Sequence, residues 1–362
     1  MKRLNRKTIL LAIPRPWDQM WGQEKDLINE LNSTYDITVL EWFDRDNFER
    51  KYTIPNNTQI VFRKTKINRG LASTISNTVR SITDVLKYPH DIYITYNTLS
   101  NTFALILEKL RGKKVLLIYA DDLPELYKTN SYLAYWLTKY IANPIASRVA
   151  NKIVVTASLL EKDIDVGHKT TWIPNGVNLS LIKRTKLKKS GRFTVGFVGG
   201  FGNWVDFDIV ISVAQRNMDI DFLLVGDGEE YSYVKNKTKG LKNVILTGMV
   251  HKDRANGYMG MMSVCLIPFK KNRVTDRVSP IKLFEYWGHG KPVIVSRCYE
   301  MVKTGKDLVL YADNAEELEQ QILKLENDDR LRSALAKKSI NEVKNFDWKV
   351  LGHKYKEILK SL

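Results

Sequence analysis

The sequence predicts a two-domain α/β protein in which each half is a Rossmann-like sheet. Its 362 residues are too many for one typical core. A strand-like apolar run at residues 9–13 is followed by a loop and an amphipathic stretch at 24–31, and this strand, loop, helix order begins again at residues 194–198. Sites in such sheets form beyond the carboxyl ends of the strands, so we expect the functional residues in those loops, in a cleft between the halves.

The remaining pattern alternates strands with helices. In the first half, strands are expected at residues 37–40, 59–62, 91–96, 114–120 and 152–156, with helices at 71–86 and 103–110. In the second half, strands are expected at residues 222–226, 244–247, 264–268 and 292–296, with helices at 206–216, within 315–343 and at 346–359. The halves are separated by a linker with six cations between residues 183 and 192, which we expect to be a solvated hinge or a contact for lipid headgroups.

The composition is that of a globular chain with an unusual charge. Hydrophobic residues make up 44% and charged residues 27%, but the formal net charge is +17. Such an excess favours an anionic partner: nucleic acid, an anionic membrane surface or a diphosphate substrate. No apolar run approaches the roughly 20 residues that a membrane-spanning helix needs. Cys265 and Cys298 form no CxxC pair and are expected to be buried reduced thiols in a cytoplasmic protein.

Several common site types have no counterpart in the sequence. The glycine-rich loop at residues 199–202 is not GxGxxG and no acidic residue follows at the dinucleotide-binding spacing, so a nicotinamide cofactor is disfavoured. There is no Walker loop and no GxSxG elbow. The five histidines are scattered and have no metal-site spacing. We therefore expect neither a cofactor nor a metal.

The most informative stretch is residues 278–296, VSPIKLFEYWGHGKPVIVS, which predicts a loop, a helix, a turn and a strand. Pro280 suits a first helical turn because its missing N–H would have no intrahelical partner there. Lys282 and Glu285 fall on one helix face near that start, where backbone N–H groups and the helix dipole favour an anion. The pattern indicates a phosphate-and-sugar site, or else an ordinary surface ion pair between residues three apart.

This stretch resembles the signature of nucleotide-sugar-dependent glycosyltransferases of the GT-B fold. The likeness is to glycosyltransferase family 4, near the bacterial teichuronic-acid and capsule transferases. The segments IPNGVN at 173–178 and VGFVGGFGNWVDFD at 195–208 are also similar to that branch. The resemblance implies two Rossmann-like domains facing a deep interdomain cleft. Its expected parts are an acceptor-binding domain at residues 1–178, a linker at 179–192, a nucleotide-sugar domain at 193–345 and a helix at 346–362 that crosses back.

The resemblance also implies roles for particular residues. Lys282 would lie by the donor diphosphate, with a catalytic role, and Glu285 by the donor ribose; Met249 and Val250 would approach the nucleobase, although as plain sequence they could be only core. The other expected contacts with the nucleotide sugar are Gly199, Gly200, Arg273, Ser279, Pro280 and Ile281. Many members carry a first glutamate eight residues before the second, but Arg277 stands there, which leaves the donor sugar and the stereochemical outcome open.

Acceptor residues are expected in the first half. Asp121 and Asp122 follow the strand at 114–120, where they could act as the base for the acceptor hydroxyl or merely cap the next helix. Trp17 and Asp18 could contact an acceptor sugar, or Trp17 could cap the core. The aromatic and basic stretch at 132–150 could lie in a membrane interface or pack on the sheet.

Together with the charge, the resemblance implies a metal-independent, retaining glycosyltransferase. It would move a hexose-type sugar from a nucleoside-diphosphate sugar, with UDP-sugar favoured, to a hydroxyl of a glycan or lipid-linked acceptor in bacterial cell-surface polysaccharide synthesis. We expect a cytoplasmic protein, peripheral on the inner face of the cell membrane, that does not bind nucleic acid. The alternatives are a nucleotide-sugar epimerase of the same fold, or a non-catalytic basic module that binds membrane or nucleic acid.

Overall fold

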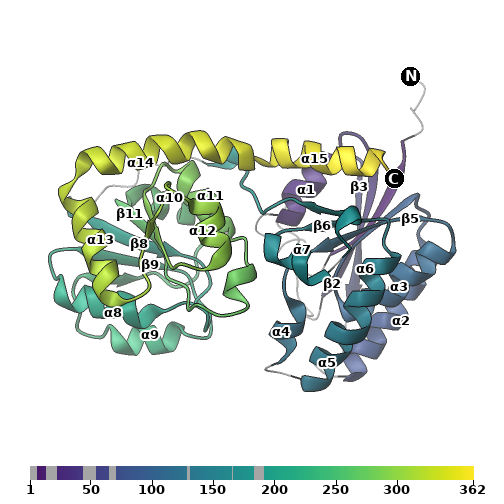
Figure 1. Ribbon diagram of the computed structural model, residues 1–362, viewed down its shortest axis with the longest axis horizontal. Coiled ribbons are helices and arrows are strands. Elements are labelled where there is room, and N and C mark those ends of the chain that lie inside the picture. Colours follow the sequence, from purple (N-terminus) through teal and green to yellow (C-terminus); the bar gives the residue numbers. More distant parts are fainter. Residues whose placement is uncertain are drawn as a thin grey trace. The chain divides into compact units, whose positions relative to one another are not determined.

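The computed structural model describes residues 6–13, 23–43, 54–64, 71–128, 131–164, 166–182 and 191–362. The chain folds into two compact units (Figure 1). The first comprises Met1–Asn175 and Trp348–Leu362, and the second Gly176–Asp347. Over the described residues, no helix is both long and apolar enough to cross a membrane.

The sheet of the first unit has seven parallel strands in the order β3-β2-β1-β4-β5-β6-β7. Chain order therefore reverses between β1 and β4. The strands are β1 Thr8–Ala12, β2 Asp36–Phe43, β3 Thr58–Lys64, β4 Ile92–Tyr96, β5 Lys114–Tyr119, β6 Lys152–Val155 and β7 Thr170–Trp172.

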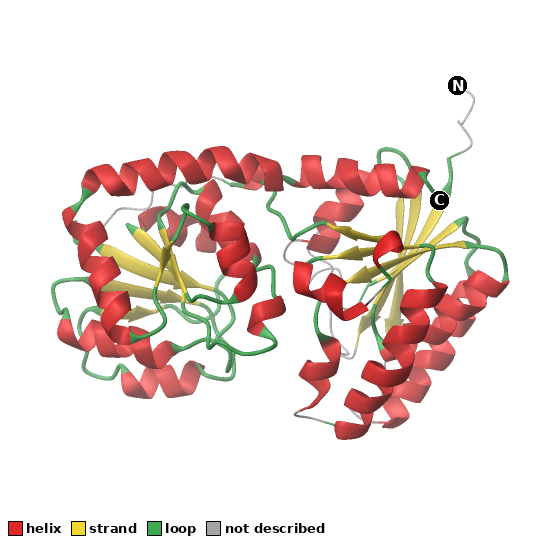
Figure 2. Ribbon diagram, viewed as in Figure 1, coloured by secondary structure: helices red, strands yellow, loops and turns green. Residues whose placement is uncertain are grey.

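Helices cover both faces of this sheet (Figure 2). The period of two in a strand turns Ile9 toward α1 and α15, and its neighbour Leu10 toward α2, α3 and α6. The helices are α1 Gln23–Leu31, α2 Leu71–Lys87, α3 Leu99–Leu110, α4 Leu123–Lys128, α5 Tyr132–Leu137, α6 Asn143–Val149, α7 Ser158–Ile164 and α15 Trp348–Lys360. A π-helical turn, Thr138–Ala142, joins α5 to α6. Pro144 lies in the first turn of α6 and does not break the helical path.

The second unit has a six-stranded parallel sheet in the order β10-β9-β8-β11-β12-β13, and its chain order reverses between β8 and β11. The strands are β8 Thr194–Val198, β9 Asp221–Val225, β10 Val244–Leu246, β11 Val264–Ile267, β12 Val293–Val295 and β13 Leu310–Tyr311. The helices are α8 Phe207–Arg216, α9 Tyr231–Lys237, α10 Lys252–Met261, α11 Ile281–Gly288, α12 Tyr299–Gly305, α13 Ala315–Asn327 and α14 Asp329–Glu342.

The second unit begins earlier in the chain than the sequence-based boundary at residue 178. Val177 donates its backbone N–H to the carbonyl of Phe346 at 3.0 Å and pairs with Asp347 in an isolated parallel bridge. Leu179 and Ile182, expected in the linker, pack against the core of the second unit. These contacts attach residues 176–182 to the second unit.

Candidate functional site

The strongest site candidate lies at the carboxyl edge of the second sheet, where strand order reverses between β8 and β11. Such switch points open a crevice in parallel sheets because neighbouring connections leave in opposite directions. Here the loops that follow the two strands are joined. Val205 forms an antiparallel bridge with Phe269, and the N–H of Lys270 donates to the carbonyl of Trp204 at 2.8 Å. The loops after β8 and β11 are thus hydrogen-bonded to each other along this edge.

Glycines allow three loops at this edge to approach to backbone contact. The N–H of Gly199 donates to Val225 at 2.9 Å, and the N–H of Gly226 donates to Gly248 at 3.1 Å. Gly226 has a φ of +135°, and a Cβ there would lie 1.9 Å from the carbonyl oxygen of Gly199. Only glycine fits at such a position, since both the backbone conformation and the space exclude a side chain.

Helix α11 starts beside these loops. Its N-cap is Pro280, which provides no side-chain cap, so the first N–H groups of the helix lack intrahelical partners. Ser279 and Pro280 are buried. The hydroxyl of Tyr286, fully buried, accepts the N–H of Val198 at 2.8 Å and fixes the helix against the end of β8.

The Lys282 amine points into this edge. Its Nζ lies 5.4 Å from the ring centroid of Phe197 and 5.8 Å from that of Phe269, and a Cβ on Gly199 would lie 1.9 Å from its Cε. Within the part of the chain that the structure describes, this amine donates no hydrogen bond and forms no ion pair. Burial lowers the pKa of the Lys282 amine, and the charge of Glu285 opposes that shift. A buried cation held only by aromatic faces is incompletely compensated, which favours an incoming anion.

The surface ion pair between Lys282 and Glu285 is absent from the described structure. The carboxylate of Glu285 instead lies 4.0 Å from the Nζ of Lys252, at the start of α10. Both side chains of that pair are mostly buried, with exposed fractions of 21% and 27%. Glu285 therefore stands at the same edge as Lys282 while leaving its amine unneutralised.

The loop before α11 is closed on itself. The side-chain oxygen of Asn272 accepts the N–H groups of Val274 and Thr275 at 2.9 and 3.0 Å. Asp276 accepts the first N–H of α12 at 2.8 Å. Arg273 lies exposed at the surface of this loop, and its carbonyl accepts from the guanidinium of Arg277 at 3.3 Å. Arg273 thus belongs to the loop that leads into α11.

The loop after β10 presents one of its two predicted nucleobase contacts to solvent. Met249 is 82% exposed, whereas Val250 is partly buried against the core. Gly248 before them has a φ of +67°, which glycine adopts without strain. Met249 is therefore available to a ligand, and Val250 chiefly positions the loop.

Asp121 and Asp122 follow β5 in the first unit. The carbonyl of Asp121 accepts the side-chain amide of Asn97 at 3.1 Å, and the carbonyl of Asp122 accepts the N–H of Leu126 in the first turn of α4 at 3.3 Å. Asp122 is only 6% exposed. The backbone of Asp122 thus begins α4, and the two carboxylates stay candidates for a base or a helix cap.

Some predicted residues lie outside the described part of the chain: Trp17, Asp18 and the linker residues 183–190. Among the described residues, no three His, Cys, Asp or Glu side chains gather as metal ligands would. Sequence reasoning missed Phe197 and Phe269, which flank the Lys282 amine. They are apolar residues at strand ends, and no sequence signal separates them from ordinary core.

Comparison with known protein families identifies the same region of the chain. The family of glycosyl transferases group 1 matches residues 192–328, which contain the loops and helix just described. The chain has the GT-B fold, and its second unit carries the match to the glycosyl transferases group 1 family. Its two doubly wound parallel sheets are the two domains of that fold.

The curated relatives of this chain are distant. It is 28% identical over 158 residues to TuaH of Bacillus subtilis, described as a glycosyltransferase of teichuronic acid biosynthesis, and this match spans 40% of each chain. It is 27% identical over 254 residues to an uncharacterized glycosyltransferase of Methanocaldococcus jannaschii, with 68% of this chain and 67% of the relative covered.

Solved structures match the chain over nearly its whole length. Sucrose-phosphate synthase from Thermosynechococcus elongatus superposes with a TM-score of 0.78 at 16% identity, covering 98% of this chain and 99% of that one. The Anabaena protein HepE, solved in complex with UDP and glucose, has a TM-score of 0.71 at 16% identity, covering 99% and 100%. At such identity the likeness establishes the fold.

Proposed function

We propose that this protein is a glycosyltransferase that moves a hexose-type sugar from a nucleoside-diphosphate sugar, preferably a UDP-sugar, to a hydroxyl group of a glycan or lipid-linked acceptor. The observation that carries the proposal is the Lys282 amine, buried at the start of α11 with no anionic partner among the described residues. A diphosphate would supply the missing charge. The UDP and glucose bound in the similar HepE structure support a uridine nucleotide as donor.

In the proposed reaction, the bond between the anomeric carbon and the diphosphate breaks, and negative charge develops on the leaving phosphate. Lys282 and the free N–H groups at the start of α11 would stabilise that charge where it appears. The N–H of Gly200, exposed and without a hydrogen-bond partner among the described residues, would add a further donor. In this proposal protein cations and backbone dipoles carry the charge, without a metal ion.

The acceptor proton has two routes in this scheme. With retention of configuration, which we favour, a phosphate oxygen of the departing donor takes it. With inversion, a carboxylate of the first unit takes it, and Asp121 or Asp122 is the candidate. The anomeric configuration of the product, read by NMR, distinguishes the two: only an inverted product would make Asp121→Asn or Asp122→Asn abolish turnover.

A panel of UDP-, GDP- and ADP-sugars tests the donor site directly. A ligand that binds only the folded state stabilises it by about 2.7 kcal/mol at a hundredfold excess over Kd. We expect a UDP-sugar to raise the melting temperature most. If none of the three classes raises it, the donor assignment fails. Turnover of donor with no acceptor present would instead indicate an epimerase.

The similarity to TuaH supports an acceptor in bacterial cell-surface polysaccharide synthesis, and hence action on the cytoplasmic side of the membrane. Incubation with a labelled UDP-sugar and a cell-envelope extract would test this proposal. The expected product is a labelled glycan or glycolipid, and label that stays entirely in the nucleotide sugar or free sugar would contradict it.

A further inference from the structure

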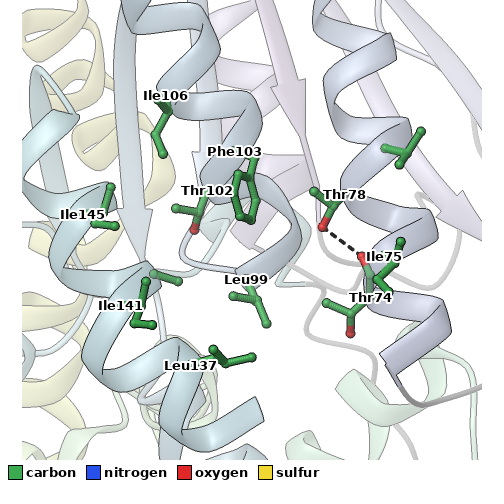
Figure 3. Close-up of a pocket in the computed structure, with 12 residues that line it drawn as sticks. Thr74, Ile75, Thr78, Leu99, Thr102, Phe103, Ile106, Leu137, Ile141 and Ile145 are labelled. Carbon is green, nitrogen blue, oxygen red and sulfur yellow. Dashed lines mark hydrogen bonds between the residues drawn. The ribbon is translucent and has the colours of Figure 1, made fainter. Parts of the chain in front are cut away.

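An apolar groove opens on the outer side of the first unit, remote in sequence from the donor loops. It has a volume of about 380 Å³ and lies among α2, α3, the π-helical turn and α6 (Figure 3). Its apolar walls are formed chiefly by Ile75, Val79, Phe103, Ile106, Ile141 and Ile145. Almost no polar surface lines it, so its occupant must be a hydrocarbon or apolar group.

The groove is additional to the core. Val85 of α2 and Leu105 of α3 are buried against the sheet, so both helices already have a packed face. Yet Ile75 is 57% exposed, Val79 is 55% and Phe103 is 52%. A helix that is apolar on a second, solvent-facing stripe needs a further apolar environment, and patches of this kind mark interaction surfaces.

An aromatic row continues this surface. Tyr132, Trp136 and Tyr140 recur every four residues along α5 and the π-helical turn, and 69%, 44% and 54% of their respective surfaces are exposed. The rings of Trp136 and Tyr140 lie 6.0 Å apart between centroids. Leu133 beside them is 55% exposed. Tyrosine and tryptophan gather at the level of lipid headgroups because each joins an apolar body to a polar tip.

The charge around the groove has one sign. The acidic residues of its helices are Asp84 and Glu108, both fully buried, and Glu108 pairs with His90 and Arg111. On α2, α3, the π-helical turn and α6, the charged residues that are exposed or partly exposed are all cations: Arg80, Lys87, Lys109, Lys139 and Arg148.

One acidic residue of the neighbouring helix α4, Glu125, lies close to two of the cations at this face. Glu125 of α4 lies 3.8 Å from Lys139 and 3.7 Å from Lys128, so it offsets part of their charge. The hydroxyl of Tyr135 accepts from the Lys139 amine at 2.7 Å and raises its pKa, so Lys139 stays protonated. Two cations against one acid leave this edge positive.

We propose that this face docks on an anionic lipid bilayer, with an acyl chain in the groove, the aromatic row at headgroup level and the cations on lipid phosphates. A bilayer explains the three features together: an apolar groove, interfacial aromatics and exposed charge of a single sign. Docking of a partner helix would explain only the apolar groove. The proposal does not depend on the sugar chemistry, since no groove residue belongs to the donor edge.

Vesicle co-sedimentation tests the proposal on the full chain. Vesicles of phosphatidylglycerol with phosphatidylcholine should bind the protein, and pure phosphatidylcholine should bind it more weakly. The double variant Phe103→Ser/Ile141→Ser should bind at least about tenfold more weakly, because two apolar side chains are lost from the lipid. Lys139→Gln should lower binding to the anionic vesicles about fivefold and leave binding to neutral ones unchanged.

Val350→Ser is the matched control, since Val350 is 42% exposed on α15, on the opposite face of the same sheet. It should bind vesicles like the wild type. Unchanged melting temperatures and an unchanged response to UDP would show that the variants fold. Vesicle binding should persist in Lys282→Met, so failure of the donor site and failure of the docking face are separate results.

Three outcomes would overturn the docking face. One is wild-type protein that binds neither kind of vesicle. Another is equal binding by the wild type and the double variant. The third is a concentration-dependent dimer that the double substitution abolishes, which would assign the groove to a second copy of the chain.

Discussion

Replacing Lys282 by methionine removes the one group on which the donor site chiefly depends. Methionine keeps a long flexible side chain of similar width between Phe197 and Phe269 but carries no charge. In the free protein the substitution should raise stability, because a buried amine with no ion pair among the described residues is replaced by an apolar group. In the presence of UDP the variant should lose most of its response.

The size of that loss follows from the contact removed. A hydrogen bond to a charged group contributes about 1.5–3 kcal/mol, equivalent to a rise in Kd of about 10- to 150-fold. At a UDP concentration of about 100 times the wild-type Kd, stabilisation should fall from about 2.7 kcal/mol to about 0.3–1.3 kcal/mol. For a unit of about 170 residues, that is a fall from about 5–11 °C to about 1–5 °C in melting temperature.

The stabilisation of the free protein should depend on pH. Burial lowers the pKa of the Lys282 amine below its usual 10.5, so the unfolded chain holds that proton more tightly. Between the folded and unfolded pKa values, folding releases a proton and wild-type stability rises with pH. The advantage of Lys282→Met should therefore be fully present at lower pH and shrink as the pH approaches 10.5.

Differential scanning fluorimetry with and without UDP, repeated across pH, measures the stability of the free variant, its response to UDP and the pH dependence of its stability. Lys324→Met is the matched control, because Lys324 is an exposed lysine on α13 of the same unit. It should change neither the response to UDP nor the pH dependence. A Lys282→Met variant that responds to UDP like the wild type would refute the argument that this amine awaits a diphosphate.

Three further predictions concern the same unit. Gly199→Ala should destabilise the protein, because Gly199 has a φ of +153° that strains any other residue, and it should weaken UDP binding, because its Cβ would displace the end of the Lys282 side chain. Gly200→Ala, with no atom within 4 Å of its Cβ, should leave the melting temperature nearly unchanged. Glu285→Gln should weaken binding of UDP, measured by calorimetry, far more than binding of inorganic pyrophosphate, and equal losses would argue against a ribose contact. Burial raises the pKa of Cys265 to about 12 and of Cys298 to about 11, so neither thiol should react with a disulfide reagent at pH 8 until the chain unfolds.

The sequence predicted the fold class because its signals are local. Strand-length apolar runs alternate with amphipathic stretches. Each strand and helix that was predicted between residues 194 and 296 is a strand or a helix of the second unit. The glycine-rich loop after β8 was also visible in the sequence. Residues 176–178 were assigned to the first domain and 179–182 to the linker, whereas all of them lie in the second unit. The sequence does not reveal this, because the pairing of Val177 with Phe346 and Asp347 is not a local property.

For the site, the sequence by itself determined that Lys282 and Glu285 share one face at the start of a helix, because helical periodicity fixes that. Only the tertiary structure decided what surrounds them. It put the Lys282 amine between Phe197 and Phe269, and it paired Glu285 with Lys252 instead. The exposed stripe beside the groove was decided in the same way, since a helical pattern gives the spacing of apolar residues but not which apolar face meets the sheet. Packing between segments distant in the chain decides which side chains are buried. Burial in turn shifts the pKa of an ionisable group such as the Lys282 amine and the free energy of exposing an apolar one.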